Sequence, residues 1–217
     1  MKDLRPILLI FSLVLQGASF VTPSSGLENT DLAGGEEQKN RQPASQRTVL
    51  SLRETPRALN TEEIRALLKR YNFYATCWNN NKEFCNPEGD FQNHIIDNRN
   101  GTISDTATGL MWQHGGSPEP LTWQGAKAYA EEANREAFAG HIGWRLPTIE
   151  ELASLMERSW KNNDLFIDPI FDKSQRQCWS GDTKDGDTAW KADFHLGFFI
   201  DRPVTEPNSV RLVRTDP

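Results

Sequence analysis

The chain has 217 residues, a formal net charge of −6 and 37% hydrophobic residues, which is enough apolar material for one domain with a buried core and additional segments. The acidic balance and the lack of a basic stripe argue against nucleic acid as a partner. Seven tryptophans are many for this length and indicate an aromatic core or, alternatively, a stacking surface.

The first residues have the pattern of an export signal. Basic residues precede a short apolar run over 7–15, and small residues at 17–19 suit cleavage. The run is too short for a comfortable membrane span, and no cysteine follows it that could carry a lipid anchor. We therefore expect a signal peptide over 1–19 and an exported mature chain without a membrane span. An uncleaved anchor is the alternative.

A polar stretch and then a first helix follow. Residues 20–53 are rich in Ser, Gly, Gln and Glu without apolar periodicity, which predicts a disordered spacer. From 54 to 99 we expect an N-terminal extension made of one helix and a long loop. Asn60 is placed to cap the helix, acidic residues fill its first turn, and apolar residues between 64 and 71 share one face. Since a lone helix of this length is marginal in water, it should pack on the main domain.

Two of the three cysteines lie close together in the long loop. In an oxidising compartment Cys77 and Cys85 could form a disulfide, which would stabilise so short a loop by about 2–3 kcal/mol. A redox-sensing role for the pair is an open alternative. Cys178 is left over and is predicted to be a buried thiol. Because no Cys-x-x-Cys pair occurs and the four histidines are scattered, a zinc site is not supported.

From residue 100 onward the pattern predicts two helices and then hairpin-built strands. One helix is expected over 121–137, capped by Thr122, and the second from 149 to about 160, capped by Thr148. Strands are expected over 101–105, 110–113, 177–180, 188–194, 198–200 and 209–214. This order of elements indicates an α+β domain over 100–217.

The stretch Trp144-Arg145-Leu146-Pro147-Thr148 is central to this domain. Pro147 cannot continue a preceding helix, and Thr148 with Glu151 three residues later forms a capping box. A buried arginine is costly unless it is paired. We therefore expect Arg145 to be largely buried and to pair with a carboxylate or with carbonyls from the late strands.

Five motifs in one order resemble the Lcl C-terminal domain family, a bacterial and usually exported module largely of unknown function. They are Asp105-x-Ala107-Thr108-Gly109-Leu110-Met111-Trp112-Gln113, Leu121-Thr122-Trp123 with Ala126, Trp144-Arg145-Leu146-Pro147-Thr148 with Glu151-Leu152, Trp179-Ser180, and Val210-Arg211-Leu212-Val213-Arg214. The resemblance covers roughly residues 100–214. It implies a C-type-lectin-like fold with two helices on a twisted, mostly antiparallel sheet, and an N-terminal helix appended.

The motif residues that we expect to be structural are Trp112, Trp144, Arg145, Pro147, Thr148, Glu151, Trp179 and Arg211. The resemblance also implies an exported, periplasmic or secreted protein in a bacterium. Its function would be non-catalytic binding or recognition, because the best-known type of member binds a sulfated polysaccharide. A glycan or another surface polymer is therefore the expected ligand.

The candidate ligand residues lie in the turn-rich loop over 181–187 and the strand that follows. They are Asp182, Lys184, Asp185, Asp187 and Trp190. A solvated hairpin turn is the alternative interpretation, since Asp and Gly are favoured in turns for backbone reasons. Spaced aspartates could bind calcium, but the loop lacks the full calcium-loop pattern and its terminal Glu. No cofactor is therefore assigned.

Two other functions stay open. An envelope scaffold or protein-interaction module would suit the spacer and the added helix, with an envelope protein as the partner. An enzyme of the related formylglycine-generating fold shares an Arg-Leu-Pro-Thr segment, but its chemistry needs a cysteine pair where this chain has only Cys178. His114 and His141 are the only candidate bases, and no triad order or phosphate-binding glycine loop occurs. No catalytic or metal site is predicted.

Overall fold

The computed structural model describes residues 48–77 and 82–216. The expected signal peptide, most of the expected spacer and the Asn79-Asn80-Asn81 loop lie outside these residues. The elements in chain order are α1 (Thr61–Arg70), the 3-10 helix η1 (Lys82–Phe84), β1 (Ile95–Asp97), β2 (Thr102–Asp105), β3 (Leu110–Gln113), α2 (Trp123–Arg135), the 3-10 helix η2 (Phe138–Gly140), α3 (Ile149–Ser154), β4 (Gln177–Thr183), β5 (Thr188–Asp193), β6 (Phe198–Pro203) and β7 (Val213–Thr215).

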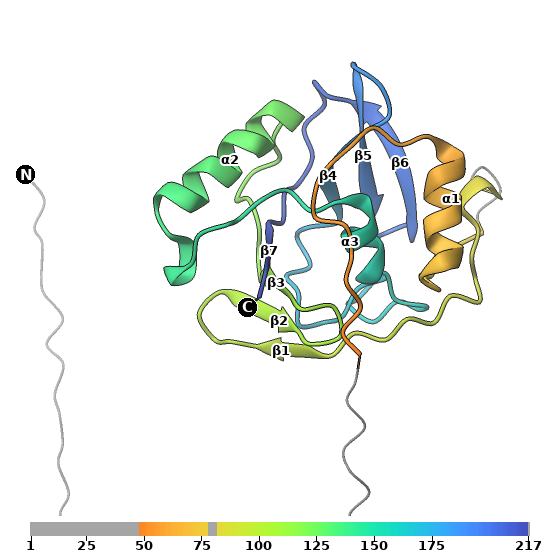
Figure 1. Cartoon of the computed structure of the whole chain (residues 1–217), viewed down its shortest axis with the longest axis horizontal. Helices are drawn as coiled ribbons and strands as arrows, with labels where there is room; N and C mark the ends of the chain where they lie inside the picture. Colours follow the sequence, from red (N-terminus) through yellow and green to blue (C-terminus); the bar gives the residue numbers. More distant parts are fainter. Residues whose placement is uncertain (1–47, 78–81, 217) are drawn as a thin grey trace, which may run out of the picture. The chain divides into compact units, whose positions relative to one another are not determined.

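The named strands form two antiparallel sheets (Figure 1). One sheet has the order β1-β2-β3-β7 and the other the order β4-β5-β6. In the first sheet the last strand of the chain pairs with β3, so that Arg214 lies opposite Met111. In the second sheet two hairpins follow each other directly along the chain. The α+β class predicted from the sequence is therefore confirmed.

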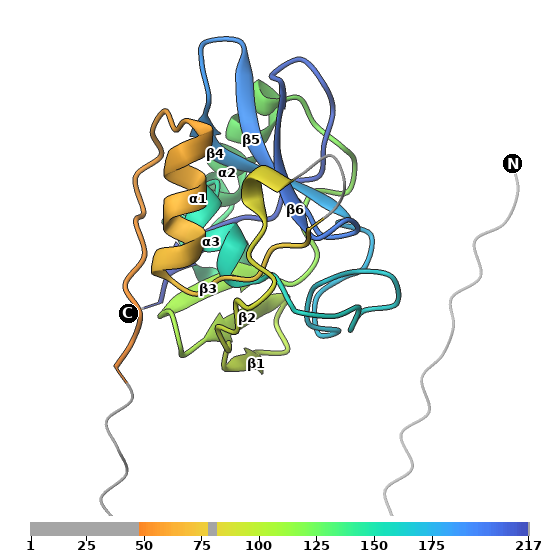
Figure 2. The ribbon, with the colours of Figure 1, turned by 90° about the vertical axis from the view of Figure 1, so that its right-hand side faces the viewer.

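Helices α1, α2 and α3 begin at the predicted caps. The side chains of Asn60, Thr122 and Thr148 accept backbone N–H groups of the first turn, and two of these sites are complete capping boxes. Figure 2 shows α1 and α3 together on one side of β4–β5, and α3 contacts α1 and both strands. Within the described ranges, none of the helices combines the length and the apolar character that a membrane span requires.

Helix α3 is shorter than predicted, because it ends at Ser154 instead of near Trp160. After it the backbone N–H of Glu157 donates to Phe166 O, and that of Lys161 donates to Leu165 O. These pairings use the amides that a longer helix would have needed. Trp160 consequently lies outside the helix and is 58% exposed.

In the described part of the chain, the core consists of two hydrophobic clusters. The larger cluster packs α1 and α3 against the second sheet, and the smaller cluster lies under α2. Trp112 and Trp190 belong to the first, and Trp144 and Trp179 to the second; all four are buried. For these four tryptophans, the aromatic-core interpretation is the one that the structure supports.

Residues 48–59, here called the strap, lie against the domain. The strap starts beside the β2–β3 turn, where Leu50 N donates to Ala107 O, and it ends beside β4, where Ala58 forms a parallel bridge with Thr183. In Figure 1 it passes α3 on the way. Leu52 is buried. The predicted spacer over 20–53 therefore extends too far, because its described residues 48–53 belong to the folded domain.

The later strands also differ from the prediction. Gly181–Thr183, expected in a loop, extend β4, so the exposed turn is confined to 184–187. The strand expected over 209–214 is β7, which starts only at Val213. Just before it, Ser209 makes a parallel bridge with Cys178. Residues 210–212 are all buried although they belong to no named strand.

The disulfide predicted between Cys77 and Cys85 is present. Cys178 is a free, buried thiol, as predicted, and burial raises its pKa from the ordinary value of 9.0 to about 11.

The raised pKa of the Cys178 thiol predicts a pH-dependent loss of stability. Between pH 9 and 11 the unfolded chain loses this proton while the folded chain keeps it, so the free energy of unfolding should fall as the pH rises through this window. Urea unfolding at pH 8, 9 and 10.5 should show a smaller decline for Cys178→Ala than for the wild type. Parallel pH profiles for the two proteins would contradict the assignment.

Candidate functional site

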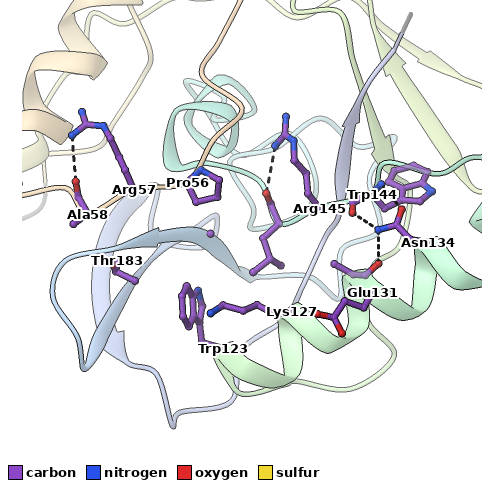
Figure 3. Close-up of a pocket in the computed structure, with 13 residues that line it drawn as sticks. Pro56, Arg57, Ala58, Trp123, Lys127, Glu131, Asn134, Trp144, Arg145 and Thr183 are labelled. Carbon is purple, nitrogen blue, oxygen red and sulfur yellow. Dashed lines mark hydrogen bonds between the residues drawn. The ribbon is translucent and has the colours of Figure 1, made fainter.

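An open cleft lies between α2, the strap and the segment Trp144–Leu146 (Figure 3). Its volume is about 540 Å³, within the usual range for small-ligand sites. Its walls are Pro56–Ala58 of the strap, one face of α2, and residues Gly181 and Thr183 of β4. The cleft thus joins segments that are far apart in the sequence.

Trp123 and Lys127 stand one above the other on the α2 wall. They are four residues apart, and the Lys127 ammonium lies 3.5 Å from the centroid of the Trp123 ring. The indole is fixed, because its Nε1 donates to Ser180 O at 2.8 Å. Among the residues that the structure describes, no carboxylate lies within ion-pair distance of Lys127. Its positive charge is therefore available to a ligand.

Arg145 also lines the cleft, and its main partner is Glu151. Its Nη1 and Nη2 donate to the two carboxylate oxygens at 2.7 and 2.6 Å. The prediction of a carboxylate partner is confirmed, but this carboxylate belongs to the following helix. The late strands contact the segment through a backbone bridge between Arg145 and Val213. The Arg145 side chain is 23% exposed, so it is largely buried, as expected, and its accessible part faces the cleft.

Asn134 connects α2 to Gly143 and Trp144 through three hydrogen bonds. Its amide N–H donates to Trp144 O at 2.7 Å, and its Oδ1 accepts the backbone N–H groups of Gly143 and Trp144 at 2.7 and 2.8 Å. The sequence analysis missed this residue. An asparagine near the end of a helix carries no local signal for a contact nine or ten residues away.

Asp182 is buried, although the sequence suggested a ligand role for it. It accepts two hydrogen bonds from the Arg53 guanidinium at 2.8 and 2.9 Å, and one each from the backbone N–H groups of Arg57 and Ile149 at 2.7 Å. Its oxygens are therefore occupied by protein donors. The prediction that it contacts a ligand at the surface is wrong for this structure.

The other candidate ligand residues divide into two groups. Trp190 is buried and its indole N–H donates to Leu59 O, so it cannot meet a surface ligand. Lys184, Asp185 and Asp187 lie in the exposed β4–β5 turn. Asp185 accepts the backbone N–H groups of Asp187 and Thr188, and the former bond lowers the pKa of its carboxyl. This geometry is that of a hairpin turn, the alternative interpretation.

The β4–β5 turn nevertheless approaches the cleft at one point. A second, smaller cleft of about 380 Å³ is lined by Gly186 of the turn, by Val204 and Thr205, and by Trp123 and its neighbours. Trp123 is the residue that the two clefts share. The turn is therefore beside the site, but its charged side chains do not line the larger cleft.

Most residues expected to be structural are buried. Trp179 donates to Leu121 O, and Pro147 and Thr148 are inaccessible. Arg211 is buried, lies over the Phe171 ring and donates to Gly115 O and Asp172 O; burial lowers its pKa. Over 48–77 and 82–216, no group of three or more His, Cys, Asp or Glu side chains is arranged to hold a metal ion.

A family model described as the Lcl C-terminal domain matches residues 101–214, more than half of the chain. The chain belongs to the Lcl C-terminal domain family. No curated protein matches it. In this Lcl C-terminal domain protein, α2, Trp144–Leu146 and β4 lie inside the matched region, whereas the strap and α1 precede it.

Replacing Asp182 with Asn should destabilise the protein strongly. The change removes the charge that pairs with Arg53, and an amide cannot accept all four hydrogen bonds, so we expect the free energy of unfolding to fall by about 2–4 kcal/mol. Asp187→Asn, the same substitution in the exposed turn, should change it by less than about 0.5 kcal/mol. Urea unfolding measures both. Equal stability of the two variants would contradict the role of Asp182.

Arg145→Ala should also lower stability, because it leaves the buried Glu151 carboxylate without its charged partner. The expected loss is about 2–3 kcal/mol. Arg135→Ala, which removes an exposed arginine of α2, is the matched control and should stay within about 0.5 kcal/mol of the wild type. An Arg145→Ala protein that melts normally but loses ligand binding would make Arg145 a ligand contact and not a structural residue.

Proposed function

We propose that this protein is an exported, non-catalytic binding module that takes an acidic segment of a glycan or another surface polymer into the cleft. The observation that carries the proposal is the Lys127 ammonium over the Trp123 ring, in a cleft that Arg57 and Arg145 also line. An aromatic face beside a cation suits a sugar ring that bears an acidic substituent.

The charge of the cleft differs from the charge of the chain. Three cationic side chains and the single carboxylate of Glu131 line the cleft, whereas the protein as a whole carries −6. A cleft lined by one sign of charge raises the local concentration of ligands of the opposite sign. Because Arg145 is paired with Glu151 and Arg57 with Glu63, the cation that attracts an acidic group of the ligand first is Lys127.

The lining residues support binding without catalysis. They include no histidine or cysteine, and Glu131 has no second carboxylate beside it in the cleft. Mechanisms built on histidine, on a cysteine nucleophile or on paired carboxylates need such groups within hydrogen-bond reach of the reacting atoms. Recognition through charge and aromatic contact needs only the side chains that are present.

Two further features support the proposal. The Cys77–Cys85 disulfide is typical of an oxidising compartment, in agreement with the export signal expected over 1–19. Family membership and the arrangement of α2 and α3 with two antiparallel sheets support a C-type-lectin-like fold. These features support the proposal that the protein acts in the periplasm or outside the cell.

The test is binding of the full chain to an array of sulfated, carboxylated and neutral polysaccharides, with and without calcium. We expect binding to acidic polysaccharides, measured quantitatively with dextran sulfate against neutral dextran. Lys127→Ala should weaken binding to dextran sulfate by about 10-fold, since a hydrogen bond to a charged group is worth about 1.5 kcal/mol or more.

The matched control is Lys69→Ala, which removes the same charge from an exposed position on α1. It should change the affinity less than about 2-fold. Equal losses in both variants would reveal non-specific attraction. If the wild type bound no polysaccharide on the array, the proposal would be contradicted, and the envelope scaffold or protein-interaction alternative would be favoured.

A further inference from the structure

One wall of the cleft comes from outside the family domain. Pro56, Arg57 and Ala58 line the cleft, and all three precede residue 101, where the family match begins. The cleft of this protein is therefore made jointly by the Lcl C-terminal domain and by its own N-terminal extension.

Strand β4 of the domain holds this part of the strap in place through Thr183 and Gly181. Both backbone groups of Thr183 bond to the strap. Its N–H donates to Arg57 O, and its carbonyl accepts the N–H of Leu59. A Cβ atom added to Gly181 would lie 2.6 Å from the Pro56 ring, so a glycine is needed where the strap crosses β4. The position of the wall is therefore fixed by the fold.

Arg57 is the charged residue on this wall, and its guanidinium makes two exposed hydrogen bonds, one to Glu63 and one to Ala58 O at 3.2 Å. Its Nη1 donates to Glu63 of α1 at 2.6 Å, and both side chains are exposed, at 48% and 37%. This bond lowers the pKa of the Glu63 carboxyl. An exposed ion pair contributes at most about 1 kcal/mol, so exchange of Glu63 for another anion costs little.

Glu63 does not depend on Arg57 for its position. Its Oε2 accepts the Asn60 N–H at 2.9 Å, as part of the capping box that starts α1. If Arg57 left, Glu63 would keep this bond. Figure 3 shows Arg57 and Lys127 on different walls, the strap and α2. The Arg57 guanidinium is turned toward Ala58 and away from Lys127, so it has to release Glu63 and turn into the cleft before one ligand can contact both cations.

We infer that the strap is the specificity-determining wall of the cleft, where Arg57 exchanges Glu63 for a second acidic group of the ligand. The inference rests on the proposed function. The ligand class that follows is a segment with at least two acidic substituents, one for Lys127 and one for Arg57. A ligand with a single acidic group uses Lys127 alone.

The experiment compares two small sulfated probes, sucrose octasulfate with many acidic groups and glucose 6-sulfate with one, on the full chain. Arg57→Ala should weaken binding of the octasulfate by about 5-fold, equivalent to about 1 kcal/mol, and leave glucose 6-sulfate unchanged. Glu63→Gln keeps a residue suited to the capping box but releases Arg57, and it should strengthen octasulfate binding.

Arg65→Ala is the matched control, because Arg65 forms a similar exposed pair with Glu62 on α1 and lies away from the cleft. Its affinities should equal those of the wild type. Gly181→Ala, which displaces Pro56 but keeps every charge, should weaken octasulfate binding in protein that still melts cooperatively.

The outcomes separate the two levels of the proposal. If Lys127→Ala weakens binding but Arg57→Ala and Glu63→Gln bind both probes like the wild type, the inference about the strap is wrong and the proposed function stands. If Arg57→Ala weakens binding of both probes equally, the inference is also wrong. A cation that binds the second acidic group should affect only the probe that carries more than one. If the wild type binds neither probe, both levels fail.

Discussion

The buried carboxylate of Asp182 is the interaction on which the arrangement of the site depends. A buried charge is costly unless it is paired and fully hydrogen-bonded. Here Arg53 of the strap supplies a two-bond pair, and the backbone N–H groups of Arg57 and Ile149 supply the remaining donors. One side chain of β4 thus fixes the strap and the start of α3. Because Arg57 and Gly181 line the cleft next to these bonds, the same carboxylate sets the cleft walls.

A second carboxylate completes the arrangement at the start of α3. Glu151 accepts Thr148 N as well as the Arg145 guanidinium, and its side chain is inaccessible. Helix α3 has only six residues, too few to be stable by itself. Its position is therefore set by Asp182 and Glu151 at its first turn and by burial of its apolar residues. Arg145 consequently serves two purposes, since it neutralises Glu151 while its partly exposed side chain lines the cleft.

Local rules in the sequence predicted the helix starts, because the caps at Asn60, Thr122 and Thr148 depend only on the next three residues. The end of α3 could not be predicted in this way, since it is decided by pairing of the chain near Glu157 with Phe166. The role of Asp182 was missed for a similar reason. An Asp next to Gly in a polar stretch fits a turn, and its partner Arg53 lies 129 residues away. The strap was missed because its leucines, at positions 50, 52 and 59, form no periodic pattern in a polar stretch.

The residues that identify the family and the residues that would select a ligand are mostly different. Trp112, Trp144, Trp179 and Arg211 carry the family resemblance and are buried, so they specify the scaffold. Among the cations that line the cleft, Lys127 on α2 and Arg57 on the strap belong to no family motif. Arg145 and Trp123 do belong to motifs, but Arg145 is engaged by Glu151. Since function resides in sites that a fold presents, membership in the Lcl C-terminal domain family defines how the cleft is built but not what it binds. The choice of ligand then depends on a few side chains at the cleft walls. One of them, Arg57, comes from the segment that precedes the domain.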